Sequence, residues 1–492
     1  MASDEAAIER LQMSAVDGRA ENGRFRQDQL QSLHRALREE AGKICAALQA
    51  DSDLSAAEVE TEFYLAMEAI RHFYDSLDFD KDLKDEYSVV HGKDNSNRRV
   101  GLGVVIIKPT SHTRLYSVVT PLAAAIAAGN CVLLDLSTTL LQIDTILRAL
   151  LNQALDVNTF SILKGNGEDL GANGLALVDQ SNHATSQSHL TSATKSRCVA
   201  IVDRSADIDA AAKAIATARF SFGGYSPYAP DLVLVNEFVK KDFFEACSRY
   251  ATLSFAGVSG VRKVRRNESE EVRKAIDDAE AKSQVSTFGS NEFKLVDILD
   301  KTTPIAKIKI TGRYLPIATC SSLTDAVYNQ DHGDSLLAGY FFAEPGSAKY
   351  LAQFLPCHIS LINQIPTHLL VGPAAPTAHA PDFLYRYNRN MFSVPRPQYV
   401  EKTPQNFQKV EDLLTSGISG KTKSKVTTSM LREAAIKILP PTRQSENEGV
   451  GFFESGLLTG ASIYLSMILP TLGFTAYFLG KKGVEYASRL RH

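Results

Sequence analysis

The sequence predicts an α/β fold with parallel sheets, followed by one membrane-spanning helix near the C-terminus. Short β-branched runs alternate with helical patterns over most of the chain, an order typical of parallel strands joined by helices. An uncharged apolar stretch then covers residues 456–480. At 492 residues the chain is too long for one simple core, so two or three domains are expected.

The composition is that of a globular protein and gives no reason to expect a nucleic-acid partner. Hydrophobic residues make up 44% of the chain and charged residues 22%, and the formal net charge is -3. A basic cluster at residues 262–266 is followed at once by glutamates. A solvated loop that leads into a helix explains this pattern better than a binding patch does.

The cysteines and histidines indicate neither a disulfide framework nor a metal site. None of the six cysteines forms a CxxC pair, and no histidine cluster has metal-ligand spacing. We therefore expect free thiols in a reducing compartment and no bound metal. The first residues, MASDEAAIERLQ, resemble neither a secretory signal nor a mitochondrial presequence.

The expected elements begin with helices and continue with strands and helices in alternation. Leucines recur at helical spacing in the amphipathic region 5–75. Strands are expected at 103–107, 131–134, 160–163, 175–178, 199–202 and 232–235, and helices at 121–129, 145–155, 207–219, 236–255 and 268–281. The polar run 181–198 is expected to be a loop. Residues 401–455 indicate a partly helical linker, rich in Ser, Thr and Lys.

Residues 456–480 carry no charged side chain and are expected to span a membrane. About 20 apolar residues suffice for one crossing, whereas two crossings would need roughly twice as many. Tyr464 and Tyr477 suit the two interfaces, and Pro470 is tolerated in membrane helices. A buried core helix and a helix lying on the surface are the alternatives. The position after a linker, at the end of the chain, favours the span.

The residues beyond this span suggest a tail anchor whose body stays in the cytosol. Without an N-terminal signal, a large domain is not expected to cross a membrane. The positive-inside rule points the other way, because Lys481, Lys482, Arg489 and Arg491 follow the span. This conflict stays open, and the sequence does not distinguish the endoplasmic reticulum, the peroxisome and the mitochondrial outer membrane.

Three segments carry a family resemblance: residues 102–137, which contain AIAAGN, residues 200–235, which contain APD, and KITGRYLPI at 309–317. They resemble the aldehyde dehydrogenases, most of all the branch with membrane-anchored fatty aldehyde dehydrogenases. The resemblance covers about residues 8–400.

The resemblance implies a specific domain order. It implies N-terminal helices with a degenerate dinucleotide-binding, Rossmann-like domain over 1–200, a catalytic-like α/β domain over 201–384 and an oligomerisation tail over 385–400. The linker 401–455 and the transmembrane helix 456–480 would then follow.

The residues that this family needs for aldehyde oxidation are missing at the matching positions. The family uses a cysteine thiolate as nucleophile, an amide that holds the oxyanion, and a glutamate as general base. Pro227 stands at the nucleophile position, and it offers neither a thiol nor a backbone N–H. Ala193 stands at the base position and His112 at the amide position. Only His112 retains a hydrogen-bond donor, so no complete catalytic set is expected.

The nucleotide-binding residues of the family are replaced as well. Asp135 stands where the family has a ribose-contacting lysine, and Lys309 stands where it has a glutamate. The spacing between 175–178 and 200 is too short for the family helix that lies under the pyrophosphate. The glycines of GNGEDLGANG, residues 165–174, do not match GxGxxG and are read as turns. We therefore expect neither NAD nor NADP as a cofactor.

Cys198 and four residues of a possible cleft are the candidates for a substitute site near the lost nucleophile. Cys198 is either a replacement nucleophile or a small buried strand residue, and the second reading is favoured because no base partner is evident. A residual cleft is expected to be lined by His112, Tyr225, Ser226 and Tyr228, or else the tyrosines fill the former aldehyde tunnel.

The sequence is compatible with three functions. The first is a non-catalytic, membrane-tethered pseudoenzyme that acts as a scaffold, as a homodimer or as the partner of an active paralogue. The second is an enzyme with altered chemistry on a hydrophobic aldehyde or a lipid or secondary-metabolite intermediate. The third is a binding module for fatty aldehydes or acyl chains. An open nucleotide pocket would favour the second, and a filled one the first.

Overall fold

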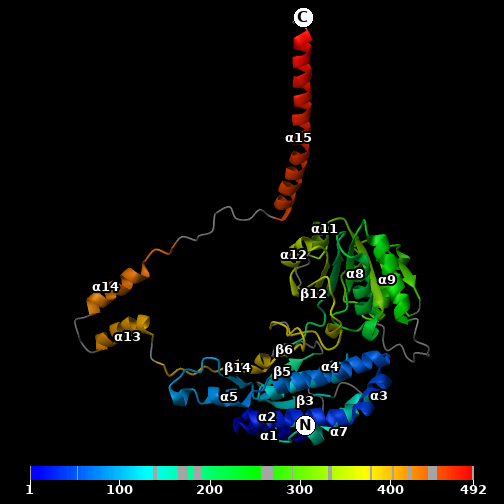
Figure 1. Cartoon of the computed structure of the whole chain (residues 1–492). Helices are drawn as coiled ribbons and strands as arrows, with labels where there is room; N and C mark the ends of the chain where they lie inside the picture. The colour runs from blue at the N-terminus through cyan, green and yellow to red at the C-terminus, as the bar shows by residue number, and fades with distance from the viewer. Residues whose placement is uncertain are drawn as a thin grey trace. The chain divides into compact units, whose positions relative to one another are not determined.

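The computed structural model divides the chain into two compact units, Met1–Glu401 and Lys402–His492 (Figure 1). The structure describes residues 2–52, 54–136, 141–164, 175–180, 190–255, 270–290, 292–330, 335–376, 379–401, 404–418, 424–440 and 452–489. The glycine-rich run 165–174, the basic cluster 262–266 and most of the polar run 181–198 lie outside the described residues.

The first unit begins with the helices expected over residues 5–75. They are α1 (Ala2–Val16), α2 (Gly23–Glu39), α3 (Ala41–Asp51) and α4 (Ala56–Asp75), and the short helix α5 (Phe79–Glu86) follows. The leucines of α2 at helical spacing are fully buried. Ser55 and Glu58 form a capping box at the start of α4, which fixes where that helix begins.

A five-stranded parallel sheet forms the Rossmann-like part of this unit. Its strand order is β4-β3-β2-β5-β6. The strands are β2 (Val104–Lys108), β3 (Cys131–Leu134), β4 (Phe160–Ile162), β5 (Ala176–Asp179) and β6 (Leu190–Thr191), joined in part by α6 (Arg114–Ala127) and α7 (Gln142–Ala154). Val105 and Ile107 pack into the core that contains α6, whereas Val104 and Ile106 pack against α1. Both faces of the sheet are therefore covered, as parallel sheets require.

The second sheet of this unit has seven strands and is covered by helices on both faces. Its order is β13-β12-β7-β8-β11-β10-β9, and the pairs are parallel except for β9 with β10. The strands are β7 (Cys198–Val202), β8 (Leu232–Asn236), β9 (Val285–Gly289), β10 (Lys294–Ile298), β11 (Tyr314–Cys320), β12 (Leu336–Phe342) and β13 (Cys357–Ile362). The helices α8 (Ile208–Phe220) and α9 (Lys240–Phe255) cover one face, and α10 (Glu270–Ala281), α11 (Leu323–Tyr328) and α12 (Pro345–Phe354) cover the other.

Two details differ from the sequence expectation. Helix α6 begins at Arg114 and not near residue 121, because the carboxylate of Glu62 in α4 accepts hydrogen bonds from the backbone N–H groups of Leu115 and Tyr116. This cap comes from a distant helix and has no local sequence signal. The polar run 181–198 contains the short strand β6 and ends in β7, so residue 200 lies inside a strand of the second sheet.

One strand of a small antiparallel ribbon lies within the segment 385–400, which was expected to form the oligomerisation tail. Strand β1 (Arg99–Gly101) pairs with β14 (Ser393–Pro395). The side chain of Arg99 donates to the hydroxyl and carbonyl oxygens of Ser393.

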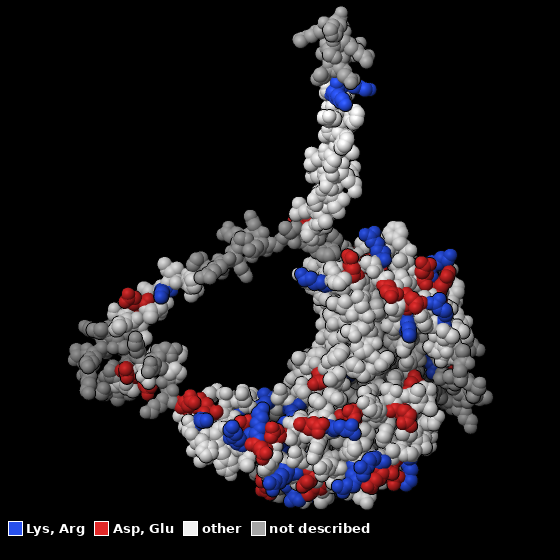
Figure 2. Space-filling model, viewed as in Figure 1, with Lys and Arg blue, Asp and Glu red and all other residues white. Residues whose placement is uncertain are grey.

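The second unit contains three described helices. They are α13 (Gln405–Ile418), α14 (Ser424–Ala435) and α15 (Phe452–Arg489). Within α15, residues Glu454–Lys482 are long and apolar enough to cross a membrane, and none of the most apolar window is buried. Figure 2 shows that the middle of α15 carries neither blue nor red atoms. The lack of burial disfavours the core-helix alternative.

The Glu62 cap predicts a pH-dependent stability. Burial raises the pKa of Glu62 to about 7, above its ordinary value. The folded state therefore binds this proton more tightly, so its contribution to stability is complete below the ordinary pKa and is lost as the pH rises towards 7. We expect a loss on the order of 3 kcal/mol across that range.

Glu62→Gln should abolish this slope, because the amide does not titrate. Urea unfolding of the full chain in detergent, followed from about pH 5 to pH 8, measures it. Glu68→Gln, a partly exposed position on the same helix, is the control and should keep the slope. Because His112, whose pKa is lowered by burial, adds a slope of its own to every variant, the measured quantity is the difference between Glu62→Gln and the wild type. A difference that stays constant with pH would contradict the assignment.

Candidate functional site

A buried segment, residues 369–375, lies between the two sheets and is called the bridging segment here. All of its residues are buried. It begins at the end of the short helix η6 (Thr367–Leu370). Gly372 has a φ of 94°, and an added Cβ would lie 2.5 Å from the ring of Tyr116. Only glycine fits this close approach to α6 without displacement.

The bridging segment forms hydrogen bonds with several of the segments around it. Its Gly372 N–H donates to Thr113 Oγ1 at 2.7 Å, in the loop before α6. Its Ala374 carbonyl accepts from Ser192 Oγ at 2.7 Å, just beyond β6. The guanidinium of Arg386 donates to three carbonyl groups of the segment, those of Leu369, Val371 and Pro373. The segment therefore fills the region between the sheets as a fixed, hydrogen-bonded wall.

Pro227, at the family's nucleophile position, is buried in the loop between α8 and β8. Its carbonyl oxygen accepts a hydrogen bond from Lys309 Nζ at 2.6 Å and another from Cys198 Sγ at 3.2 Å. The position is therefore occupied by an acceptor that is already satisfied from two sides. Neither a thiol nor a backbone donor is present at Pro227.

Lys309 belongs to a buried ionic network. Its Nζ lies 2.9 Å from Asp231 Oδ2, and Asp231 is fully buried. The guanidinium of Arg219, also fully buried, lies 3.8 Å from the other oxygen of Asp231. Burial lowers the pKa of Arg219 to about 10, so it remains a cation at neutral pH. The amine of Lys309 therefore points into the protein, towards Asp231 and Pro227.

Asp231 also orders the backbone at the start of two segments. Its carboxylate accepts from the N–H of Cys198 at 2.7 Å and from that of Ile310 at 2.9 Å. Arg219 in turn donates to the carbonyl groups of Gly224, Ile310 and Gly312. These charge-assisted bonds tie the loop around Pro227 to β7 and to the segment before β11.

Cys198 is closer to the nucleophile position than the sequence separation suggests, yet it is a buried strand residue. It is the first residue of β7 and has no solvent exposure. Burial raises the pKa of its thiol to about 12, so a thiolate is scarce at neutral pH. Its thiol donates to Pro227 and does not face an open cleft, which supports the structural reading of this residue.

His112 contacts the bridging segment. Its Nε2 donates to the carbonyl of Leu370 at 2.9 Å, and its ring meets that of Phe222 edge to face. Burial lowers the pKa of His112 to about 4, so the ring is neutral at physiological pH. A neutral imidazole has one N–H, and the contact to Leu370 uses it. This ring therefore has no further donor for an oxyanion.

The other three residues expected to line a cleft have different environments. Tyr228 is fully buried, and its hydroxyl accepts from the N–H of Ala375 at 3.0 Å while Arg386 stacks 4.5 Å from its ring. Ser226 is buried and accepts from the N–H of Tyr228. Tyr225 is 39% exposed. His112 and Tyr228 thus both contact the bridging segment, whereas Tyr225 lies at the surface.

The nucleotide side of the site carries buried charge. Asp135 follows β3 and is buried, and its N–H donates to the carbonyl of Ile107 at 2.9 Å. Ala193 follows Ser192 and is partly buried against the core. Arg114, at the start of α6, forms a buried bidentate pair with Asp144 of α7. An ion pair therefore links the starts of these two helices.

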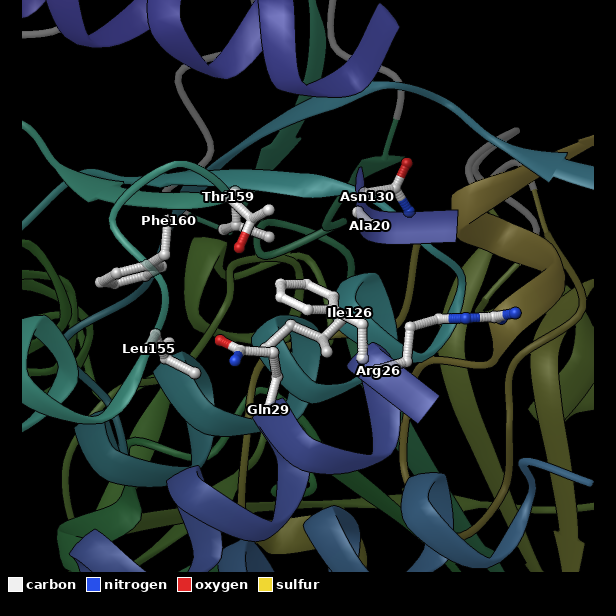
Figure 3. Close-up of a pocket in the computed structure, with 10 residues that line it drawn as sticks. Ala20, Arg26, Gln29, Ile126, Asn130, Leu155, Thr159 and Phe160 are labelled. Atoms are coloured by element: carbon white, nitrogen blue, oxygen red, sulfur yellow. The ribbon is translucent and has the colours of Figure 1, made fainter. Parts of the chain in front are cut away.

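The pocket drawn in Figure 3 lies elsewhere and is small. Residues of α2 and α6 and of the strands β3 and β4 line it, among them Arg26, Gln29, Ile126, Asn130 and Phe160. Its volume is about 10 Å³, which is about the space of one water molecule. Among the described residues, no group of three or more His, Cys, Asp or Glu side chains could hold a metal ion.

Sequence reasoning missed Asp231, Arg219, Arg114 and the bridging segment. A weak signal existed for the charged residues, because Asp231 interrupts the buried run APDLVLV and Arg114 opens an apolar helix. A charge in such a run indicates a buried partner. The bridging segment has neither helical nor strand periodicity, so no pattern could identify it.

Removing the charge of Asp231 should destabilise the protein strongly. Asp231→Asn leaves the cations of Lys309 and Arg219 buried without their counter-ion, which costs about 3–5 kcal/mol. Urea unfolding of the full chain in detergent gives this difference. Asp209→Asn, which breaks the exposed pair with Arg249, is the matched control and should have little effect. Equal effects of the two substitutions would disprove a dominant role for the buried network.

Comparison with known proteins agrees with this architecture. Residues 5–182 match the aldehyde dehydrogenase family. Mouse aldehyde dehydrogenase family 3 member B3 is 25% identical over 71% of this chain and 78% of its own length, and mouse family 3 member B1 is 26% identical over 70% and 79%. The solved structure of Staphylococcus aureus AldH aligns with a TM-score of 0.66 at 21% identity, covering 82% of this chain and 94% of that one. The chain therefore has the aldehyde dehydrogenase fold, and its residues 5–182 resemble a domain of the aldehyde dehydrogenase family.

Proposed function

We propose that this chain is a non-catalytic, membrane-tethered aldehyde dehydrogenase-like protein that acts as a scaffold or as a partner subunit. The observation that carries the proposal is the environment of Pro227. Pro227 has no thiol, and its backbone carbonyl accepts from Lys309 and Cys198, so this loop is held inward by internal hydrogen bonds. Aldehyde oxidation needs a thiolate there that attacks a carbonyl carbon.

The residues nearest to Pro227 do not supply a replacement. The thiol of Cys198 is protonated at neutral pH and buried. The N–H of His112 is used by Leu370. Ala193 has only a methyl group and cannot act as a general base. These observations also speak against an enzyme with altered chemistry built on the same residues.

The residues at the nucleotide positions do not fit NAD or NADP. Lys309 is bonded inward to Asp231 and Pro227 and is not directed at a ribose. Asp135 replaces the family's ribose-contacting lysine with a buried carboxyl group, which would repel the 2′-phosphate of NADP. We derive no hydride transfer for this chain.

A partner role is supported by the parts of the chain that do not belong to the site. The ribbon of β1 and β14 offers strand edges that a second copy or an active paralogue could extend. The apolar part of α15, Glu454–Lys482, would hold the chain in a membrane, with its body on the cytosolic side. A homodimer or a mixed dimer in the membrane is the assembly that we propose.

Nucleotide binding is the first test of this proposal. The full chain in detergent should show no heat of binding and no rise in melting temperature with NAD or NADP up to about millimolar concentration. The mouse dimeric NADP-preferring aldehyde dehydrogenase, 24% identical, is the positive control. Micromolar binding would refute the loss of the nucleotide site.

Restoring the thiol alone should not restore turnover. Pro227→Cys adds the nucleophile, but the base position and both nucleotide contacts remain changed at Ala193, Asp135 and Lys309. We expect no NAD(P)-dependent oxidation of long-chain aldehydes, measured by nicotinamide absorbance. Ser226→Cys serves as the neighbouring control. Turnover in Pro227→Cys but not in Ser226→Cys would mean that only the nucleophile had been lost, contrary to the proposal.

A further inference from the structure

The helices between the body and α15 expose apolar side chains. Helices α13 and α14 contact each other and lie side by side in Figure 1. On α13, Phe407, Val410 and Leu414 recur at helical spacing and are 56%, 39% and 69% exposed. The contact between the two helices therefore leaves an apolar face uncovered.

The end of α14 exposes more apolar surface than α13. Met430 is 53% exposed, and Ile436, Ile438 and Leu439 just after the helix are 72%, 91% and 84% exposed. Isolated exposed apolar residues are ordinary, but three large aliphatic side chains within four consecutive residues need a partner. We call α14 together with Ile436–Leu439 the juxtamembrane surface.

The charge of the juxtamembrane surface is positive. It carries Lys425, Arg432 and Lys437 against one acidic residue, Glu433. Basic side chains beside exposed aliphatic side chains are the combination that binds the interface of an anionic membrane.

The chain connection limits how far this surface can be from the bilayer. Pro440 and Phe452, where α15 begins, are twelve residues apart. A fully extended chain spans at most about 3.6 Å per residue, so the two ends lie within roughly 43 Å of each other. With Glu454–Lys482 in a membrane, this length of chain allows the juxtamembrane surface to reach the lipid headgroups on the side where the span begins.

We propose that the juxtamembrane surface lies on the anionic lipid surface from which the span of α15 emerges. The inference rests on the membrane tether of the proposed function and adds a second, interfacial contact to it. The aliphatic side chains of Ile436–Leu439 would enter the headgroup region, while Arg432 and Lys437 would meet lipid phosphates. A second copy of the chain is the other occupant that the test distinguishes.

The absence of tryptophan from the sequence allows a clean optical test. Ile438→Trp places a single reporter on the juxtamembrane surface. Phe474→Trp places it inside the span, and Phe238→Trp places it on an exposed position of the body, 74% accessible. Each full-length variant is reconstituted into vesicles of phosphatidylcholine and phosphatidylserine, with lipids brominated near the headgroup or deep in the acyl chain.

The expected result is a blue-shifted emission of Ile438→Trp with quenching by headgroup-brominated lipid. Phe474→Trp should be quenched by deeply brominated lipid, and Phe238→Trp by neither. If Phe474→Trp is quenched and Ile438→Trp is not, the interfacial contact is refuted while the tether stands. If neither is quenched, both the tether and the contact are refuted. A blue shift of Ile438→Trp without quenching would point to a second copy and overturn the proposal.

The charge contribution is tested in the same reporter. Adding Arg432→Glu and Lys437→Glu to Ile438→Trp should remove most of the headgroup quenching on vesicles with phosphatidylserine. Adding Lys241→Glu and Lys274→Glu, which lie on the body, should leave it unchanged. Equal quenching of all three proteins, or equal quenching on vesicles of phosphatidylcholine alone, would overturn the assignment to an anionic surface.

Discussion

Two cations and two backbone N–H groups converge on the carboxylate of Asp231, which has no access to solvent. Removing these charges from water costs free energy of desolvation, and the ion pairs and hydrogen bonds offset it only if each partner stays in place. The loop of Pro227, the start of β7 and the segment before β11 are therefore fixed relative to one another. The rigidity of this region therefore follows from the buried charges themselves.

The same network holds Lys309 inward. If its amine moved away from Asp231, one of the two cations on this buried carboxylate and the bond to the Pro227 carbonyl would be lost. The bridging segment acts on the other side of the loop. Because it bonds to Thr113, Ser192 and Tyr228, it joins the two sheets through a continuous set of buried hydrogen bonds.

Up to residue 281 the sequence was sufficient for the order of most strands and helices, because alternating burial leaves a regular pattern. The later strands β9 to β13 and the helices α11 and α12 were not predicted. The sequence also identified Cys198 as a buried strand residue. The contacts of the site were beyond its reach, since Asp231 and Lys309 are 78 positions apart and Glu62 caps a helix 53 positions away. Such pairs depend on how the sheets pack, and periodicity carries no information about packing between distant segments. The bridging segment was missed for a related reason: its order comes from hydrogen bonds and a glycine, not from a repeat of apolar residues.

The apolar helix at Glu454–Lys482 would lower the affinity that a partner interface needs, if the helix crosses a membrane. Two proteins confined to one bilayer search a surface and not a volume, and their orientations are already restricted. Much of the translational and rotational entropy of association is thereby lost before they meet. A short strand edge such as that of β14 could then suffice for an assembly that would dissociate in solution. Confinement to one bilayer would let a small interface support a long-lived complex, to which other proteins could then bind.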